Sequence, residues 1–271
     1  MASSLPKHLT ILGGSGFLGR RIAQTAILNG YSVTALSRSG KPPATTSPVD
    51  SQWVSKVNWR PANIFQPDSY KHYLEDSDVV VHSIGVILEK VNYKKVVNGP
   101  GSGFINTLLS FSGNKSVGDD AVAAASGKLD TYEKVNHESA VLLAEEYLNS
   151  TKVPHPKFVY ISADNAPAIV PGGYMKSKRA AEFDLMELSQ HTNLTNLIVR
   201  PGFMFDETDS TSVRSGLHKV IDFAHGVPGI GSLVSPSIST QQVAKAIFSK
   251  LEEGTNVENE VVSLENLMAM D

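Results

Sequence analysis

Three glycines near the start of the chain are spaced so that their backbone could bind a phosphate group. Gly13, Gly16 and Gly19 follow the apolar, β-branched run His8–Leu12 and precede a segment with helical periodicity. The first glycine permits a sharp exit from a strand, the second lets backbone amides approach a pyrophosphate, and the third lets a helix pack closely on a sheet. The helix N-terminus adds partial positive charge. The pattern predicts a dinucleotide site, and the alternative is a glycine-rich turn that binds nothing.

The residues that end the second predicted strand favour NADP over NAD. An NAD site usually has Asp or Glu there, about 20 residues past the glycines, to accept hydrogen bonds from the adenosine ribose. This chain has Ser37, Arg38 and Ser39 instead. The guanidinium of Arg38 could pair with a 2′-phosphate, and the serine hydroxyls could add donors. We therefore predict NADP(H) as the cofactor, the alternative being that Arg38 is a solvated loop residue.

Alternating strands and helices are needed to bring these residues together. Short apolar runs predict strands at residues 8–12, 31–36, 56–60, 78–84, 157–162 and 193–200, with a loop at 39–51. Helical periodicity predicts helices at residues 17–28, 131–149, 173–191 and 240–253, the last with Thr240 as its N-cap. The alternation predicts an α/β fold of the Rossmann type, which is a doubly wound parallel sheet with a small C-terminal substrate lobe.

Composition narrows the class of protein. With 271 residues, of which 41% are hydrophobic and 19% charged, we predict a single NAD(P)-binding domain over residues 1–271. The net charge of −3 provides no general positive field for nucleic acid. The absence of cysteine excludes thiolate catalysis and Cys-ligated metals, and the eight histidines lack the spacing of a helical metal site. No apolar run reaches the roughly 18–20 residues of a membrane-spanning helix.

Two segments depart from the regular alternation. Residues 89–130 are rich in Gly and Ser, which predicts an insertion or a mobile lid. Residues 203–240 combine aromatic side chains with a Gly/Pro-rich stretch, which predicts a small substrate or partner lobe. Such an apolar segment could accept a hydrophobic quinone or contact a membrane surface or a partner protein, but the same side chains could equally fill the core of the lobe.

Motifs along most of the chain resemble those of extended and atypical short-chain dehydrogenase/reductases. They follow the family's order as GGSGFLG (13–19), VVHSIG (80–85), YMKSKRAAE (174–182) and IVRPG (198–202). The chain is most similar to the fungal mitochondrial proteins of ubiquinone (coenzyme Q) biosynthesis, on YISAD (160–164) and RPGFMFDE (200–207), and more distantly to the nucleotide-binding accessory subunit of respiratory complex I. The resemblance implies a mitochondrial protein that binds NADP(H), with ubiquinone-biosynthesis proteins as partners.

The resemblance also implies catalytic roles. In active members a Tyr-x-x-x-Lys pair does acid/base work on a carbonyl or alcohol, because the lysine lowers the pKa of the phenol. Tyr174 and Lys178 match this pair and share one helix face. The family adds a hydroxyl at the end of the preceding strand, where this chain reads Ser162-Ala163. If alanine occupies that position, a donor to the developing oxyanion is lost, although Ser162 or Asp164 could replace it in a shifted loop.

By the same resemblance, each part of the cofactor has expected contacts. At the pyrophosphate we expect Gly13, Ser15, Gly16, Phe17 and Leu18, at the adenosine phosphate Ser37 and Arg38, and at the adenine Asn63 and Ile64. Beneath the cofactor we expect Ser83, Ile84 and Gly85, and around its nicotinamide half Tyr174, Lys178, Pro201, Gly202, Phe203 and Met204. His82, at the end of a predicted strand, is interpreted as a structural group.

Two functions from different classes fit this sequence. In the first, the protein is an NADPH-dependent oxidoreductase acting on a quinone precursor or another hydrophobic carbonyl through Tyr174 and Lys178. In the second, it is an accessory or regulatory component of the ubiquinone-biosynthesis complex, and bound NADPH mainly rigidifies its fold. The alanine at position 163 favours the second.

Overall fold

A computed structural model describes residues 6–44, 48–86, 131–165, 171–208, 218, 221, 222, 225, 235–253 and 259–270. The predicted insertion at 89–130 lies entirely outside the described residues, and so does much of the predicted lobe at 203–240. Among the described residues, no helix is both long and apolar enough to cross a membrane.

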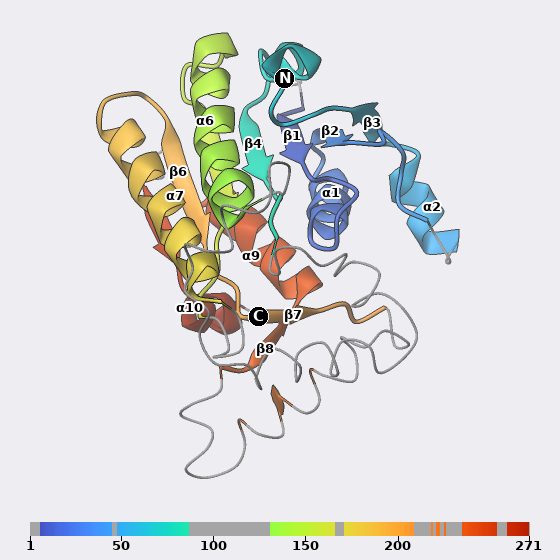
Figure 1. The fold of residues 1–271 in the computed structure, drawn as a ribbon. Coiled ribbons are helices and arrows are strands. Elements are labelled where there is room, and N and C mark those ends of the chain that lie inside the picture. The colour runs from blue at the N-terminus through green and yellow to red at the C-terminus, as the bar shows by residue number, and fades with distance from the viewer. Residues whose placement is uncertain are drawn as a thin grey trace.

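The core of the molecule is a seven-stranded parallel sheet, which confirms the predicted Rossmann-type fold (Figure 1). Its order is β3-β2-β1-β4-β5-β6-β9. The strands are β1 (His8–Leu12), β2 (Ser32–Ser37), β3 (Asn58–Pro61), β4 (Val79–His82), β5 (Lys157–Ile161), β6 (Thr195–Val199) and β9 (Glu260–Val262). The order reverses between β1 and β4, and ligands of such sheets bind in the crevice at the carboxyl ends of these strands.

Helices cover both faces of the sheet and build a separate core on each. The helices are α1 (Gly19–Leu28), α2 (Pro48–Val54), α6 (Ser139–Ser150), α7 (Gly172–Gln190), α9 (Thr240–Glu252) and α10 (Leu264–Ala269). One core joins α1 and α9 to residues such as Ile11 and Val81, and the other joins α6 and α7 to residues such as Leu12 and Val80. Neighbouring strand residues thus point into opposite cores, as the period of two requires.

Several predicted boundaries were wrong by a few residues. The first helix begins at Gly19 and not at Phe17, because the glycine turn continues through Leu18. The stretch predicted as a loop at 39–51 contains the start of α2. The fourth strand ends at His82, before Ser83. The helix predicted at 131–149 consists of a π-helix, η3 (Glu133–Glu138), followed by α6.

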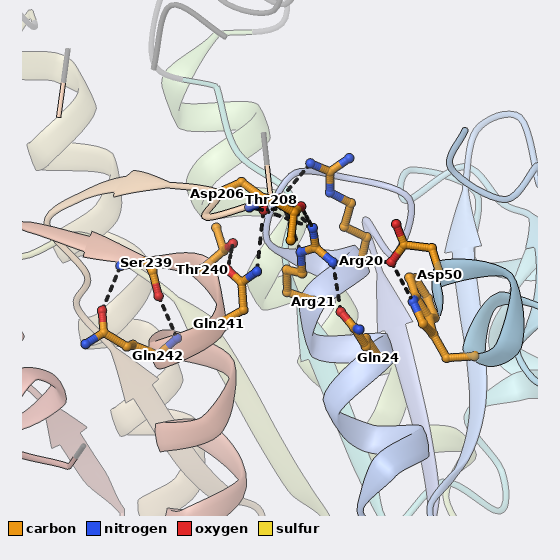
Figure 2. Close-up of polar contacts among 11 residues, drawn as sticks. Arg20, Arg21, Gln24, Asp50, Asp206, Thr208, Ser239, Thr240, Gln241 and Gln242 are labelled. Atoms are coloured by element: carbon orange, nitrogen blue, oxygen red, sulfur yellow. Dashed lines mark hydrogen bonds and ion pairs between the residues drawn. The ribbon is translucent and has the colours of Figure 1, made fainter. Parts of the chain in front are cut away.

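A small second sheet lies beside the main one and is formed by β7 (Phe203–Phe205) and β8 (Ser237–Ser239). It leads directly into α9, whose N-cap is Ser239 and not the predicted Thr240. Ser239 and Gln242 form a capping box, in which each side chain accepts a hydrogen bond from the other residue's backbone nitrogen (Figure 2). The start of α9 is therefore fixed next to the end of β7.

Candidate dinucleotide site

The turn between β1 and α1 has the shape that the glycine spacing predicts. Gly13 has a φ of +92°, and a Cβ built on it would lie 2.5 Å from the carbonyl oxygen of Ser83. A Cβ on Gly16 would lie 2.8 Å from the carbonyl oxygen of Gly13, and one on Gly19 would overlap the same oxygen. Each motif glycine is thus required by close backbone packing. The turn forms a cradle that side chains would fill.

The first turn of α1 opens at the crevice without a side-chain cap. Leu18 occupies the N-cap position and supplies no hydrogen-bond acceptor. Helix N-termini carry a partial positive charge and unsatisfied N–H donors, which suit an anion. The backbone of Ser15, Phe17 and Leu18 lies in this segment, between half-buried Gly13 and buried Gly19. The geometry fits a pyrophosphate group, as the glycine spacing predicts.

At the adenosine end, the chain turns tightly after β2. The Gly40 nitrogen donates to the carbonyl oxygen of Ser37 at 3.2 Å and to its hydroxyl at 3.1 Å, and Gly40 has a φ of +63°. This turn presents Arg38 as an exposed side chain, for which the described part of the structure records no hydrogen bond or ion pair. A guanidinium at the edge of the crevice whose donors are not taken up by the described residues can bind an anionic group.

The predicted adenine contacts follow β3 on the same side. Asn63 is exposed, and its side-chain oxygen accepts a hydrogen bond from the nitrogen of Phe65 at 3.2 Å. The backbone oxygen of Ile64 accepts a hydrogen bond from the hydroxyl of buried Tyr70 at 3.1 Å. The loop is thereby fixed against the core at the carboxyl edge of the sheet.

Beneath the crevice, the segment after β4 joins the glycine turn to a buried polar cluster. The nitrogen of Ser83 donates to the carbonyl oxygen of Leu12 at 2.8 Å, which extends the β1–β4 pairing. Ile84 lies near Gly13, and a Cβ on Gly85 would lie 3.4 Å from Asn136 Oδ1 and 3.6 Å from Lys178 Nζ. The three predicted residues Ser83, Ile84 and Gly85 therefore connect the two halves of the site.

Lys178 is buried on α7 and reaches this cluster. Its Nζ donates to the carbonyl oxygen of Ile161 at 2.7 Å and lies 4.8 Å from the centre of the Tyr160 ring. Burial lowers the pKa of Lys178 to about 7, against the opposing effect of the Glu182 charge. Tyr174 lies one turn earlier, half-buried, with its ring edge-on to Tyr132. The predicted pair thus stands at the crevice with a lysine whose charge is easily lost.

Asn136 organises the η3 side of the cluster, where its Nδ2 also donates to the hydroxyl of Ser177 on α7 at 3.3 Å. It lies in the π-helix η3, and its side chain exchanges hydrogen bonds with the backbone of Val86 at 2.9 and 3.2 Å. Its carbonyl oxygen accepts a hydrogen bond from the hydroxyl of Tyr160 at 2.6 Å. A π-helical turn frequently occurs at functional sites, because the extra residue redirects backbone groups. Asn136 thereby links the loop after β4 to β5 and η3.

His82 is a buried structural group, as its position at the end of a strand suggests. Its Nε2 lies 2.8 Å from the hydroxyl of Ser139. Burial, and secondarily the charge of Lys178, lowers the pKa of His82 to about 3. The imidazole is therefore neutral near pH 7 and unsuited to protonating a substrate.

Ser162 continues β5 and points toward α7. Its hydroxyl donates to Glu182 Oε1 at 2.5 Å, and Glu182 also forms ion pairs with Arg179 and Arg200. The nitrogens of Ser162 and Asp164 donate to the carbonyl oxygens of Val199 and Pro201, so the pairing with the β6 side is regular and unshifted. With this register, Ala163 is the residue that follows Ser162 on the other face, and the Ser162 hydroxyl is held by a carboxylate.

The remaining predicted contacts form the wall beyond β6. Pro201 is buried, and a Cβ on Gly202 would lie 2.9 Å from Leu264 and 3.1 Å from the carbonyl oxygen of Pro236. Phe203 and Met204 are half-buried residues of β7. Close packing thus holds the start of this wall in place beside the crevice.

An ion cluster at the end of this wall was missed by the sequence analysis. Asp206 follows β7, and it pairs with Arg20 and Arg21 of α1 (Figure 2). The only signal in the sequence is the pair of arginines directly after Gly19. Nothing local to that pair shows which carboxylate it would meet. No group of three or more metal-binding side chains occurs among the residues that the structure describes.

The fold and the glycine turn define a Rossmann-type, dinucleotide-binding class of protein. The model of the NAD-dependent epimerase/dehydratase family matches residues 9–99. MIOREX complex component 2 of Saccharomyces cerevisiae is 37% identical over 268 residues, which cover 92% of this chain and 94% of that protein. The chain therefore belongs to the NAD-dependent epimerase/dehydratase family of atypical short-chain dehydrogenase/reductases, and it is an NAD(P)-binding type of protein.

Solved structures agree on the fold. A short-chain type dehydrogenase/reductase from Mycobacterium ulcerans has a TM-score of 0.63 at 14% identity, covering 97% of this chain and 90% of that chain. A Burkholderia multivorans protein classed with the short-chain dehydrogenase/reductases, whose crystal structure contains bound NADP, has a TM-score of 0.60 at 13% identity, covering 97% of this chain and 98% of that chain. At such low identity, these similarities establish the fold alone. The chemistry of the site follows from its own residues.

Proposed function

We propose that this protein binds NADP(H) and acts in ubiquinone biosynthesis as an accessory or regulatory component of the biosynthetic complex. The observation that carries cofactor binding is the glycine turn at the reversal point of the sheet, where added Cβ atoms would collide with backbone. The cofactor, when bound, supplies a hydride donor or acceptor at its nicotinamide ring. The chain's own residues hold its phosphates, orient its ribose and enclose its ring.

The preference for NADP(H) rests on the turn after β2. Arg38 is exposed there, it has no hydrogen bond or ion pair to another described residue, and no carboxylate occupies positions 37–39. A carboxylate would repel a 2′-phosphate, whereas a guanidinium can form two parallel hydrogen bonds with it. The comparisons support an NAD(P)-binding family, and Arg38 is the reason to choose the phosphorylated cofactor within that family.

The choice of an accessory role rests on position 163. The regular strand register leaves Ala163 where active relatives are expected to present a hydroxyl, and Ser162 is held by Glu182. Losing one donor to a developing oxyanion typically costs about two to three orders of magnitude in rate. Lys178 and Tyr174 remain able to bind the ribose of the cofactor, which requires no turnover.

The alternative is an NADPH-dependent oxidoreductase acting on a quinone precursor or another hydrophobic carbonyl. It is favoured by Lys178, which lies one turn from Tyr174 on α7, where the positive charge of its protonated form would lower the pKa of the phenol. In that reaction Tyr174 would donate a proton to the carbonyl oxygen, and Lys178 would tune its acidity. Ser162 would contribute only if its hydroxyl left Glu182.

The biological setting is proposed from resemblance. The yeast relative bears the name of a complex component, which supports a role within a protein assembly. Similarity to the fungal mitochondrial proteins of ubiquinone biosynthesis suggests mitochondrial localisation and proteins of that pathway as partners. We also propose that the lobe at 203–240 belongs to the same single domain and that residues 89–130 form an insertion.

Cofactor titration of the purified protein tests the main proposal. Wild type is expected to bind NADPH more tightly than NADH, and Arg38→Ala should weaken NADPH binding while leaving NADH nearly unchanged. Lys56→Ala is the matched control, because it also removes one exposed positive charge but lies before β3, at the opposite edge of the sheet. Equal loss for both cofactors in Arg38→Ala would reject the phosphate assignment. Failure of wild type to bind either cofactor would reject the proposed function.

Turnover separates the two roles. For an accessory protein, NADPH oxidation over a panel of quinones and carbonyls should be near zero in wild type and equally so in Tyr174→Phe. A rate in wild type that Tyr174→Phe abolishes, with cofactor affinity intact, would favour the enzyme instead. Ala163→Ser restores the family's hydroxyl, and Ala163→Val is its control for altered packing at the same position.

A further inference from the structure

Two arginines of α1 converge on a single buried carboxylate. Asp206 is 3% exposed, and its carboxylate pairs with Arg20 and Arg21 (Figure 2). Burial opposes ionisation of Asp206, but hydrogen bonds from Arg21 and Thr208 hold the pKa of its carboxyl well below the usual range. The group is therefore ionised near neutral pH. Its single charge is shared between two permanently positive side chains.

Arg21 alone is enough to satisfy Asp206. It is 3% exposed, and its Nε and Nη2 donate to the two carboxylate oxygens at 3.2 and 2.9 Å. Its Nη1 donates to Gln24 at 2.8 Å and lies 3.6 Å from Asp50, while Nη2 also contacts Thr208. This is a two-pronged, buried pair whose remaining donors have partners. The second guanidinium is not needed to neutralise the carboxylate.

Arg20 is bound in a different way. It makes one ion pair, from Nη2 to Asp206 Oδ2 at 2.7 Å, and its side chain is 27% exposed. Its Nε is shielded from solvent and has no hydrogen-bond partner among the described residues. Figure 2 shows its guanidinium beyond the first turn of α1 and apart from that of Arg21, with one terminal nitrogen turned away from Asp206. The guanidinium is thus oriented by Asp206 and still has donors to offer.

The position of Arg20 places those donors beside the glycine turn. Its backbone nitrogen donates to the carbonyl oxygen of Gly16 at 3.1 Å, and its guanidinium lies 5.9 Å from the ring of Phe17, within the same turn. The turn from Gly13 to Gly19 contains no basic side chain of its own. A pyrophosphate carries two negative charges, and backbone amides and a helix terminus offset them only partly.

We infer that Arg20 is a ligand of the cofactor's pyrophosphate and that Asp206 orients it for that contact. The inference rests on the proposed function and adds to it a charged residue that both cofactors share. Arg38 selects the phosphorylated cofactor, whereas Arg20 binds a group that NADH and NADPH have in common. Asp206 follows the wall predicted at the nicotinamide half, so the contact also ties that wall to the phosphate turn.

Binding measurements with Arg20→Gln test the inference, because this change leaves the Arg21–Asp206 pair in place. Affinities for NADH, NADPH and ADP-ribose, which contain a pyrophosphate, should fall by a similar factor of about ten to a hundred, as for loss of a charge-assisted hydrogen bond. Affinity for 2′-AMP, which lacks a pyrophosphate, should be unchanged. Arg20→Lys should retain part of the lost affinity, since it keeps the charge without the planar fork. Lys56→Gln is the control for removing one positive charge.

The outcomes are distinct. Unchanged affinity for NADH and NADPH in Arg20→Gln would overturn the inference while leaving the proposed function intact. Equal weakening of 2′-AMP would also overturn it, because it would indicate a general structural defect. If Arg20→Gln does not fold, the same comparison is made with the neutral variant Arg20→Met, for which affinity equal to wild type for NADH, NADPH and ADP-ribose overturns the inference. Absence of any cofactor binding by wild type would instead reject the proposed function.

Discussion

At the scale of single residues, Lys178 is the side chain whose charge is most easily changed. It is buried, and its ammonium group has one recorded hydrogen bond to a protein carbonyl oxygen, that of Ile161. Burial lowers its pKa to about 7, far below the ordinary value of 10.5. A negatively charged cofactor nearby favours the protonated form, so binding and protonation are linked.

We therefore predict that NADH affinity falls as the pH rises through about 7. If binding requires protonated Lys178, the loss approaches tenfold per pH unit above the pKa. Titrations between pH 6 and 8.5 in wild type and Lys178→Met measure this, and the variant should show a flat profile. NADH is the suitable ligand because it lacks the 2′-phosphate, whose own second pKa is about 6.

Loss of the fold cannot imitate this profile. Lys178 has a lower pKa in the folded state than in the unfolded chain, so the unfolded state binds more protons between about 7 and 10.5. This group makes the free energy of unfolding rise with pH in that window. Affinity and the Lys178 contribution to stability thus change in opposite directions. A pH-independent NADH affinity in wild type would contradict the predicted role of this charge.

Residue spacing predicted the part of the site that depends on short segments. The glycines, Arg38 and the Tyr174–Lys178 pair are each defined within a few neighbouring positions, and the structure brings them to one edge of the sheet. The contact of Asp206 with Arg20 spans 186 positions, and it depends on where the chain runs through β7 after it leaves the main sheet. The orientation of the Ser162 side chain toward Glu182 likewise depends on the pairing of the chain after β5 with β6. Such contacts require the fold.

At the scale of elements, the types of the main strands and helices could be predicted, but several ends could not. Apolar periodicity found β1 and α7 almost to the residue. The π-helix η3 was read as ordinary helix, because a periodicity of 3.6 does not distinguish one inserted residue. The short strands β7, β8 and β9 have three residues each, too few for an alternating pattern.

The contact between η3 and α7 contains a titratable side chain, His137. His137 Nε2 lies 2.6 Å from Asp184 Oδ2 on α7, and Nδ1 contacts Glu133 in η3. Burial opposes protonation of His137, but the hydrogen bonds and charges of Glu133 and Asp184 outweigh it and raise the pKa. The protonated imidazole therefore connects the two elements that supply Asn136 and Lys178 to the site.

We predict that His137 stabilises the fold most at low pH. Its raised pKa means that its contribution is fully present below the unfolded value of 6.5 and is lost as the pH rises through the folded value. The difference in unfolding free energy between wild type and His137→Gln should accordingly shrink between about pH 5.5 and 8.5. His155→Gln is the control, since the side chain of His155 lies outside this cluster. A constant difference across that range would contradict the prediction.

At the scale of the whole molecule, two separate cores meet only through the sheet and its crevice. One core contains α1 and α9 and the other α6 and α7, and the predicted cofactor contacts are drawn from both sides. Gly13 and Arg20 lie with α1, whereas Lys178 and Tyr174 lie on α7. A dinucleotide that spans the crevice would therefore contact elements of both cores at once.

Cofactor binding should accordingly stabilise the entire domain, which is the effect that an accessory role requires. A ligand that binds only the folded state contributes RT ln(1 + [L]/Kd), or about 2.7 kcal/mol at a hundred times Kd. For a chain of this size, we expect the midpoint of thermal unfolding to rise by roughly 5–10 °C.

Scanning fluorimetry with increasing NADPH measures this rise, and Tyr174→Phe should retain most of it. For the same shift, Arg38→Ala should need a higher NADPH concentration than wild type but the same NADH concentration. A midpoint that stays constant at saturating NADPH, as established by separate titration, would show that the cofactor does not act through the stability of the fold.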